Sequence, residues 1–300
     1  MEKDFVGAVD IGGTKIHVGI VNTAGKSIIE ESFLTRAGER TGEEATEEIA
    51  ELLCKFCATL GIEVANLKGI GIACAGPLDL LAGTVENPYT LPGWEGYPIV
   101  RRMKELTGVK VVLENDANAA LLGEVLLKGL THEKVLMLTL GTGIGVASWN
   151  RGQLYREGKY HPEMGHVVVS SEGDECYCGH RGCFESLCSG SAVNRRSQDL
   201  GYENFDHLYH SFRTGDRKAL KFIEEFKQEI KNGVWNLSII FKPHVIILAG
   251  GLARDYFEFF KTVILEECDG NKKDFVELFQ ILPADKGINP ALAGANMMLD

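Results

Sequence analysis

The sequence lacks the main features of a nucleic-acid-binding, membrane-inserted or secreted protein. Lys and Arg number 31 against 42 Asp and Glu residues, which gives a formal net charge of -11. Nucleic acids and anionic membranes repel so acidic a chain, so binding to either is not expected as its main task. No stretch approaches the roughly 18 uninterrupted apolar residues of a membrane helix. The start, Met-Glu-Lys-Asp, lacks the basic and apolar parts of a secretory signal.

The chain contains enough apolar sequence for two cores. It has 300 residues, of which 45% are hydrophobic, a size at which a chain commonly divides into two domains. No low-complexity stretch or long linker interrupts it, so we expect two domains that share a cleft. Its eight cysteines, three of them closely spaced, fit a reducing compartment better than a disulfide framework. We therefore expect a cytoplasmic protein.

The pattern of apolar residues and turns predicts an α/β protein. Strands are expected at 5–10, 16–21, 27–35, 68–75, 109–113, 135–140, 146–149 and 245–248, with a last strand within 275–282. Helices are expected at 41–60, 98–107, 115–128, 191–200, 217–241 and 289–299. The opening pattern of strand, Gly-Thr turn and strand occurs again around residue 141, which indicates two duplicated halves. We expect the last helix to return to the first domain.

One short segment gathers cysteine and histidine. Cys176, Cys178 and Cys183 lie within eight residues, and His166 precedes them. Three thiolates and one imidazole nitrogen are the usual ligands of a closed structural zinc site. The alternative is three unrelated free cysteines and an ordinary histidine. A disulfide within Cys-x-Cys would be strained, so the segment predicts one bound Zn²⁺ with no open coordination position.

Three glycine-containing turns follow apolar strands, at Asp10–Lys15, Leu140–Gly145 and Leu248–Leu252. Glycine lets backbone N–H groups approach an anion closely, and a threonine hydroxyl adds a donor. The first turn is neither a Walker loop nor a dinucleotide fingerprint, because a strand rather than a helix follows it. One such turn is equally typical of a plain hairpin. Three together indicate a nucleotide held between two lobes.

A polar group closes one buried strand and opens a helix at Glu114-Asn115-Asp116-Ala-Asn118. The helix dipole stabilises an acid at this place, so Asp116 as an N-terminal cap is one interpretation. The other is a general base at the lobe boundary, with Asn115 bonded to a neighbouring hydroxyl. Phosphoryl transfer needs positioning, charge neutralisation and an acceptor for the hydroxyl proton.

Glu163 and Glu185 flank the cysteine segment. Zinc requires neither, so they indicate side chains fixed against a polar substrate, or else solvated surface acids. With them, Glu-Met-Gly-His at 163–166 and Cys-x-Cys-Gly-x-x-Gly-Cys-x-Glu at 176–185 resemble the signature of the ROK family of repressors, open reading frames and sugar kinases.

The resemblance covers residues 5–299 and implies a fold. This is an α/β, two-lobed, duplicated actin-like ATPase fold of the ribonuclease H-like type, with a structural zinc knuckle. We expect a smaller N-terminal lobe of residues 1–117 and 287–300. A larger C-terminal lobe of residues 118–286 would carry the knuckle.

The resemblance also assigns site residues. Asp116 would be the general base, with Mg²⁺ bridging the phosphates of ATP. The nucleotide would contact Asp10, Gly12, Gly13, Thr14, Lys15, Gly141, Thr142, Gly143, Gly250 and Gly251. The sugar would contact Asn87, Asn115, Asp116, Glu163, His166 and Glu185. His166 would use one nitrogen for zinc and the other for the sugar, beside the metal ligands Cys176, Cys178 and Cys183. Trp94, in the loop over the sugar, is interpreted as a hydrophobic anchor.

The family resemblance implies ATP-dependent phosphorylation of a hexose hydroxyl and a homodimer formed through the C-terminal lobe. Glucose is the first candidate, followed by fructose and N-acetylmannosamine. The family also contains sugar-responsive repressors with a DNA-binding region ahead of the sugar domain. Because Asp10 leaves nine residues before it and the net charge opposes DNA binding, we expect an enzyme rather than a repressor. A catalytically silent sugar sensor is a third possibility.

Overall fold

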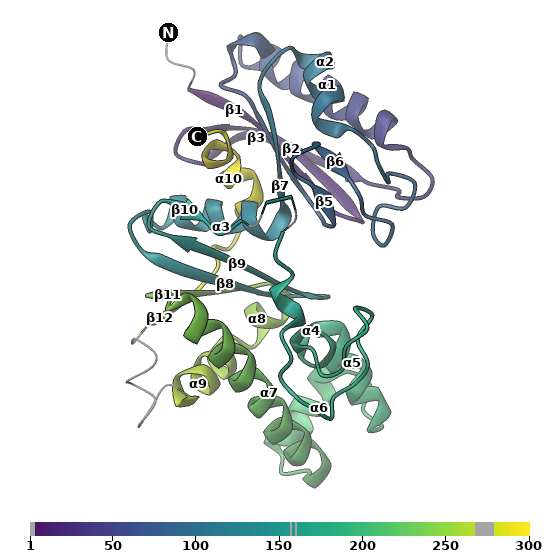
Figure 1. The fold of residues 1–300 in the computed structure, drawn as a ribbon, viewed down its shortest axis with the longest axis vertical. Coiled ribbons are helices and arrows are strands. Elements are labelled where there is room, and N and C mark those ends of the chain that lie inside the picture. The colour runs from purple at the N-terminus through teal and green to yellow at the C-terminus, as the bar shows by residue number, and fades with distance from the viewer. Residues whose placement is uncertain (1–3, 157, 160, 268–278) are drawn as a thin grey trace. The chain divides into compact units, whose positions relative to one another are not determined.

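The computed structural model describes residues 4–156, 158–159, 161–267 and 279–300 (Figure 1). The chain divides into two compact units. Unit 1 comprises Met1–His132, Trp149–Pro162 and Asp285–Asp300, and unit 2 comprises Glu133–Ser148 and Glu163–Ala284. Each unit has its own apolar core.

Unit 1 contains a five-stranded sheet in the order β3-β2-β1-β4-β7. The strands are β1 (Phe5–Ile11), β2 (Lys15–Asn22), β3 (Ser27–Leu34), β4 (Ile70–Cys74) and β7 (Val111–Asn115). The first three are antiparallel neighbours, and β4 and β7 continue the sheet parallel to β1. The other elements of the unit are η1 (Val64–Asn66), β5 (Leu78–Asp79), β6 (Thr84–Val85), β10 (Gln153–Leu154), α1 (Gly42–Thr59), α2 (Ile99–Thr107), α3 (Asp116–Leu127) and α10 (Pro290–Leu299).

Alternation along β1 divides its side chains between two layers. Val9 and Ile11 join the core that contains α1 and α2, whereas Val6 and Ala8 pack against α10. Helix α10 therefore returns to the first sheet, which confirms the expectation for the last helix.

Helix α1 shows how local sequence sets its bounds. Thr41 and Glu44 form a capping box in which each side chain accepts a hydrogen bond from the other residue's backbone N–H. Ile49, Leu53 and Phe56 then recur at helical spacing and are buried. The predicted helix 41–60 is thereby confirmed, with its two outer residues as caps.

Two glycines let α3 and α10 touch through their backbones. A Cβ atom on Gly123 would lie 1.9 Å from the Pro290 carbonyl oxygen, and one on Gly294 would lie 2.1 Å from that of Ala119. No side chain fits at either position, because real Cβ atoms do not approach backbone this closely. This contact fixes the helix that begins with Asp116 against the sheet that carries Asp10.

The second sheet has the order β10-β9-β8-β11-β12. Its strands are β8 (Lys134–Leu140), β9 (Ile144–Asn150), β10, β11 (Val245–Ala249) and β12 (Gln280–Pro283). As in unit 1, the first strand has its hairpin partner on one side and two later strands on the other. This shared order supports the duplication inferred from the sequence.

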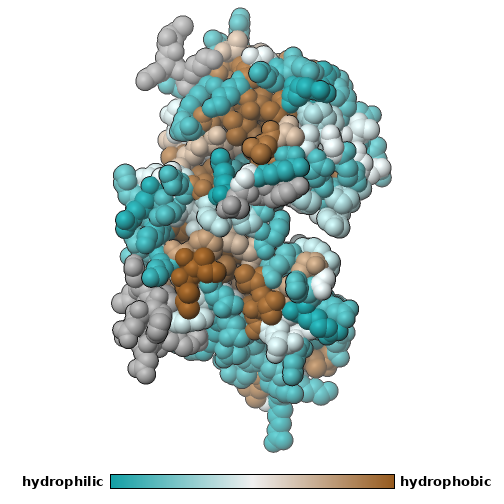
Figure 2. Space-filling view, in the orientation of Figure 1, coloured by the Kyte–Doolittle hydropathy of each residue, from teal (hydrophilic) through white to brown (hydrophobic). Residues whose placement is uncertain are grey.

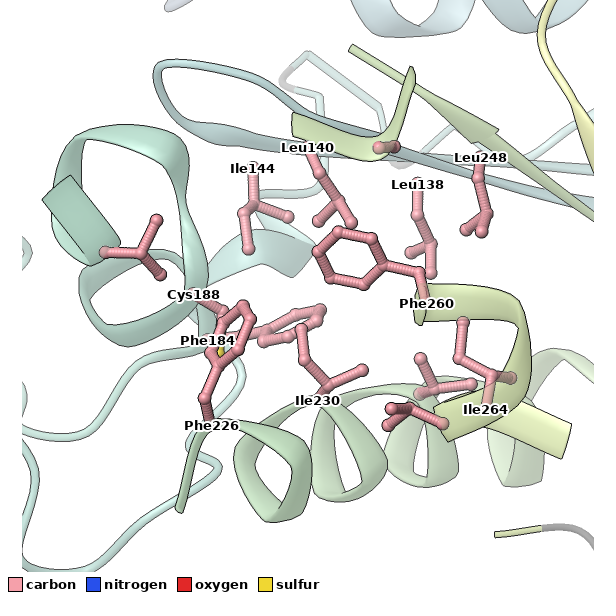
Figure 3. Packing of buried hydrophobic residues seen from close by; sticks show 14 of the residues in the cluster. Leu138, Leu140, Ile144, Phe184, Cys188, Phe226, Ile230, Leu248, Phe260 and Ile264 are labelled. Carbon is pink, nitrogen blue, oxygen red and sulfur yellow. The ribbon is translucent and has the colours of Figure 1, made fainter. Parts of the chain in front are cut away.

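Helices pack on the sheet of unit 2. They are η2 (Met164–His166), α4 (Phe184–Cys188), α5 (Gly190–Asp199), α6 (Phe205–Arg213), α7 (Arg217–Phe241), α8 (Gly251–Asp255) and α9 (Phe257–Glu267). Figure 3 shows Leu138 and Leu248 of the sheet pointing toward Phe260 and Ile230 of the helices, with Phe184 in the same cluster. Phe184 is fully buried, so the core holds its neighbours Cys183 and Glu185 in place.

Several elements differ from the sequence-based expectation. Strand β7 runs to Asn115 rather than ending at 113, and Pro98 is the N-cap of α2 rather than part of its first turn. Helices α4, α6, α8 and α9 were not predicted. Of the expected last strand within 275–282, residues 275–278 lie outside the described residues, and β12 covers its end.

The packing places α3 in unit 1, whereas the expected lobe bounds put residues 118–132 in the second lobe. The backbone contact with α10 is the physical reason for this placement. The functional lobes expected at 1–117 with 287–300 and at 118–286 stay a prediction.

The surface is mixed in polarity. Figure 2 shows apolar groups on one face of each unit, interspersed among hydrophilic side chains. Within the described part of the chain, none of the helices combines the length and apolar character needed to cross a bilayer.

The α3–α10 contact predicts that Gly294→Ala is strongly destabilising. Its methyl group would overlap the Ala119 carbonyl, so the two helices would have to separate. We expect a loss of about 3 kcal/mol in the free energy of unfolding, at the upper end for overpacking, measured by thermal and urea denaturation. Gly141→Ala is the control, because no atom lies within 4 Å of the added Cβ. Equal stability of the two variants would contradict the proposed tight contact.

Candidate active site

Asp10 and Asp116 lie where neighbouring parallel strands end. In the register of the sheet, Asp10 on β1 pairs with Ala73 on β4, and Cys74 on β4 pairs with Asn115 on β7. Asp116 follows as the first residue of α3. Because carboxyl ends of parallel strands meet at one edge, this arrangement gathers both acids.

Burial changes the acidity of both carboxyl groups. It raises the pKa of Asp10, although a hydrogen bond from Asn289 Nδ2, 2.8 Å long, and the charge of His17 oppose the rise. The pKa of Asp116 is raised to about 6, chiefly by burial and further by the charge of Asp10. The charge of Asp10 therefore acts on Asp116, whose pKa lies close to neutral pH.

Asn115, not Asp116, is the cap of α3. Its Oδ1 accepts hydrogen bonds from the backbone N–H groups of Ala117, at 2.9 Å, and Asn118, at 3.3 Å. The interpretation of Asp116 as the N-cap is therefore wrong, since Asn115 already fills that position. Asp116 is left as an acid in the first turn. The expected contact of Asn115 with a substrate hydroxyl stays a prediction.

The first glycine turn is held from a neighbouring strand end. Gly12 N–H donates to the Lys15 carbonyl at 3.0 Å, which closes the turn. Thr35 Oγ donates to the Gly12 carbonyl at 2.6 Å, and its N–H donates to the Thr14 carbonyl at 2.9 Å. Gly13, Thr14 and Lys15 remain exposed at the tip.

Asn87 and Trp94 organise their own loop. The Asn87 amide nitrogen donates to the Ala75 carbonyl and to Thr90 Oγ, while its oxygen accepts from the N–H groups of Tyr89 and Thr90. Its side chain is fully buried, so the structure shows a loop-forming role, and a sugar contact stays a prediction. Trp94 is also fully buried, which confirms it as an anchor.

Glu185 supports the second glycine turn. Its Oε2 accepts a hydrogen bond of 2.7 Å from Ile144 N–H. A Cβ on Gly143 would lie 2.5 Å from the same oxygen, so only glycine allows this approach without displacing the carboxylate. Within the turn, Gly141 N–H donates to the Gly143 carbonyl at 3.0 Å.

The second and third glycine turns meet in unit 2. A Cβ on Gly250 would lie 2.4 Å from the Leu140 carbonyl oxygen, and the φ of Gly250 is +86°. Gly190 N–H, at the start of α5, donates to the Gly141 carbonyl at 2.7 Å. The structure thus brings Gly141–Gly143 together with Gly250. It places the predicted nucleotide-binding residues Thr142 and Gly251 on the same two segments.

His166 and the three cysteines form a compact cluster. Their ligand atoms all lie within 4.8 Å of one another, with His166 Nδ1 3.4 Å from Cys176 Sγ and the Sγ atoms of Cys178 and Cys183 3.5 Å apart. A tetrahedron with Zn–S bonds near 2.3 Å has edges of about 3.5–3.8 Å. These residues therefore fit a tetrahedral thiolate site.

The His166 segment packs directly on the second hairpin. It forms the short helix η2, in which His166 N–H donates to the Glu163 carbonyl. A Cβ on Gly165 would lie 2.4 Å from the Ile144 carbonyl oxygen. Ile144 thus contacts this segment through its carbonyl and Glu185 through its N–H.

Three supporting groups were missed by the sequence reasoning. Glu114 is buried and bonds Arg156 at 2.8 Å and Asn118 at 2.9 Å. Asn289 reaches Asp10, and the hydroxyl of Tyr177 lies 3.0 Å from His166 Nε2. The Asn-Pro start of the last helix was a visible signal for Asn289, whereas Tyr177, a residue between two cysteines, had none.

The sequence from residue 6 to residue 299 matches the ROK family. The chain belongs to the ROK family. This ROK protein is 33% identical to the glucokinase of Thermotoga maritima over 266 residues, which cover 82% of the chain and 81% of that relative. It is also 26% identical to the xylose repressor of Bacillus subtilis, over 97% of the chain and 76% of the repressor.

Solved structures show the same fold. The ROK hexokinase of Thermus thermophilus has a TM-score of 0.84 and 30% identity, over 98% of this chain and 97% of that one. A ROK glucokinase of Streptomyces griseus in complex with glucose and AMPPNP has a TM-score of 0.72 and 28% identity, over 98% of both chains. The ROK protein therefore has the actin-like ATPase type of sugar kinase fold, an α/β architecture.

The raised pKa of Asp116 predicts a pH-dependent cost to stability. Folding raises this pKa from 3.8 to about 6, so between these values the folded state binds more protons than the unfolded one. Stability from this group falls as pH rises through that range and stays lower above it. The shift corresponds to about 2–3 kcal/mol, so Asp116→Asn should be the more stable protein at pH 8 and equal to wild type near pH 4. Thermal melts across this range measure the difference.

Glu44→Gln serves as a control with the opposite sign. Hydrogen bonds from Thr41 lower the pKa of Glu44, so its carboxylate stabilises the folded chain above its usual pKa. This variant should lose stability at pH 8 and match wild type in acid. Asp116→Asn that is no more stable than wild type at pH 8 would show that the buried carboxylate carries no such cost.

Proposed function

We propose that this ROK protein is an ATP-dependent sugar kinase that transfers the γ-phosphoryl group of ATP to a hexose hydroxyl. The observation that carries the proposal is Asp116, a half-buried carboxylate with a pKa of about 6 at the end of parallel strands. A general base works best when its pKa lies near the operating pH. Asp116 follows the capping residue Asn115, so its carboxylate is not needed to cap the helix.

In this proposal Asp116 accepts the proton of the sugar hydroxyl as that oxygen attacks the γ-phosphorus. The bond from the γ-phosphorus to the bridging oxygen breaks, and ADP leaves with the electron pair. Mg²⁺ would neutralise phosphate charge, which is the main demand of phosphoryl transfer. Asp10, an acid beside a glycine turn, is the group of this chain suited to that ion.

The glycine turns are the proposed nucleotide site. The tip at Gly12–Lys15 exposes a lysine and a threonine, and the second turn presents Gly141–Gly143 next to Gly250. Backbone N–H groups in such turns suit phosphate oxygens. The glucokinase from Streptomyces griseus was solved with AMPPNP, an ATP analogue, which supports ATP as the donor here.

Glu163, His166 and Glu185 are the proposed ligands of the sugar hydroxyls, with Asn87 and Asn115 assigned beside Asp116. Carboxylates and an imidazole discriminate hydroxyl positions by geometry. Glucose is the substrate we propose first, because the relative from Thermotoga maritima and the complex from Streptomyces griseus are glucokinases. Fructose and N-acetylmannosamine are the other sugars to be compared.

A non-catalytic, sugar-sensing regulator is the second candidate. The similarity to a xylose repressor favours it. A regulator has no need of a carboxyl group whose pKa burial brings near the physiological range, so the Asp10–Asp116 pair favours the enzyme. We further propose a cytoplasmic homodimer formed through unit 2. Helix α7 there exposes Ile239 and Ile240, the latter by 65%, as surface for such contact.

We propose that the cluster of His166, Cys176, Cys178 and Cys183 binds one structural Zn²⁺. The four protein ligands fill a tetrahedral shell, so the ion would serve the fold rather than act as a Lewis acid. It would orient His166, because a bond at Nδ1 leaves Nε2 directed toward Tyr177 and the substrate side.

Asp116→Asn tests the catalytic proposal. The amide keeps the shape of the side chain but accepts no proton, so kcat for glucose with MgATP should fall by about two to four orders of magnitude. The dissociation constant for glucose, measured by calorimetry, should stay within a few-fold of wild type. Asp206→Asn is the matched control, since Asp206 is an acid in the first turn of α6 and lies outside the proposed site.

A coupled assay of wild type against a hexose panel accompanies the Asp116 test. Turnover retained by Asp116→Asn would refute the role of base. Binding of a hexose by wild type without turnover of any hexose would favour the regulator.

Elemental analysis tests the metal proposal. Protein purified without added metal should contain one zinc per chain, and Cys178→Ser should lose the zinc and melt at a lower temperature. Cys54→Ser is the control, because Cys54 is exposed on α1 and lies outside the cluster. A full zinc content in Cys178→Ser, or only traces in wild type, would disprove the site.

A further inference from the structure

Tyr177 places its hydroxyl group among the residues proposed to bind sugar. The hydroxyl lies 3.0 Å from His166 Nε2 and also forms a side-chain hydrogen bond with Glu185. Its ring meets the imidazole edge-on, with 5.0 Å between the ring centroids. Glu163 is close enough for its charge to act on the phenol. One hydroxyl thus contacts two of the proposed sugar ligands of unit 2, His166 and Glu185, and the charge of the third acts on it.

A hydroxyl group fits the position between His166 Nε2 and the Glu185 carboxylate. His166 Nδ1 faces Cys176 Sγ, so Nε2 is the nitrogen directed away from the cysteine cluster. Glu185 is held by Ile144 N–H, which fixes the carboxylate. A phenol and a sugar hydroxyl each offer one O–H donor and acceptor lone pairs. Either fits between the imidazole and the carboxylate.

The Tyr177 side chain contacts the His166 ring but lies outside the apolar core of unit 2. The residue is 74% exposed, although its hydroxyl has these partners. Its neighbours Cys176 and Cys178 belong to the proposed metal cluster, whereas the Tyr177 ring is not part of the apolar core. A rotation of the side chain would break the hydroxyl contacts and leave the apolar core intact.

We propose that the Tyr177 hydroxyl is an internal substitute for a sugar hydroxyl, which the sugar displaces when it binds His166 and Glu185. This proposal rests on the proposed function. It makes Tyr177 a specificity-determining residue: a sugar that carries the displacing hydroxyl must replace existing hydrogen bonds. A sugar that lacks that hydroxyl leaves Tyr177 in place, so His166 and Glu185 keep their partner.

Tyr177→Phe tests this by removing a single oxygen atom. With zinc-loaded protein and no nucleotide, calorimetry would measure the dissociation constants of glucose, 1,5-anhydroglucitol, 2-deoxyglucose and 3-deoxyglucose. Glucose should bind Tyr177→Phe about three- to tenfold more tightly, the equivalent of one ordinary hydrogen bond. At least one deoxy sugar should bind wild type more tightly than the variant, because only in wild type does the Tyr177 hydroxyl remain to pair with His166 and Glu185. The variant should thus have the higher affinity for glucose, and wild type the higher affinity for that deoxy sugar.

Tyr202→Phe is the matched control. It also removes a phenol hydroxyl bonded to a carboxylate, that of Asp216, at the start of α7, and it should leave all four dissociation constants unchanged. If Tyr177 merely orients His166, Tyr177→Phe would bind glucose equally or more weakly, which overturns the proposal. Absence of binding by wild type and variant to every hexose of the wider panel would overturn the proposed function itself, a result distinct from equal binding by both.

Discussion

The backbone contact between α3 and α10 is the constraint on which the geometry of unit 1 depends. Gly123 and Gly294 bring the two helices closer than any side chain would permit. The contact places the start of α3, with Asp116, against the sheet, and places Asn289, the cap of α10, beside Asp10. The positions of Asp116 and Asn289 thus depend on two residues that carry no side chain.

Unit 2 uses the same principle around its own turn. Gly143 admits the Glu185 carboxylate, Gly165 admits the Ile144 carbonyl, and Gly250 admits the Leu140 carbonyl. Polar groups here are positioned by backbone that approaches within hydrogen-bond range, not by long side chains that reach across a gap. A loop held by main-chain contacts is already ordered, so it loses little further conformational entropy when it binds a ligand.

The sequence predicts what depends on local pattern. The bounds of α1, the strands with their apolar runs, and the 25-residue helix α7 all follow from periodicity and turn chemistry. Helices α6 and α9 were missed, although Phe205, Leu208 and Phe212 of α6 recur at helical spacing. Spacing also located the cysteine cluster, which is local in the chain.

Hydrogen-bond and ion-pair partners that lie far apart in the sequence could not be predicted from it. Asn289 lies 279 residues from Asp10, and Arg156 reaches Glu114 across 42 residues, so no motif links them. Asn87 is predicted to contact the sugar, and the structure adds hydrogen bonds between its amide and its own loop that the sequence did not indicate. Whether the donors and acceptors of a polar side chain are already bonded within the protein depends on its neighbours in three dimensions. Composition and spacing do not show those neighbours.

Unit 1 is assembled from three separate pieces of chain, and this has a consequence for synthesis. Residues 1–132 leave the ribosome first, but Val6 and Ala8 find their apolar cover only when residues 285–300 arrive. Until then one face of the nascent sheet is open to water and to other chains, a state prone to aggregation. Most of unit 2, from residue 163 to residue 284, is translated in that interval. The order of translation therefore favours completing the second core before the first.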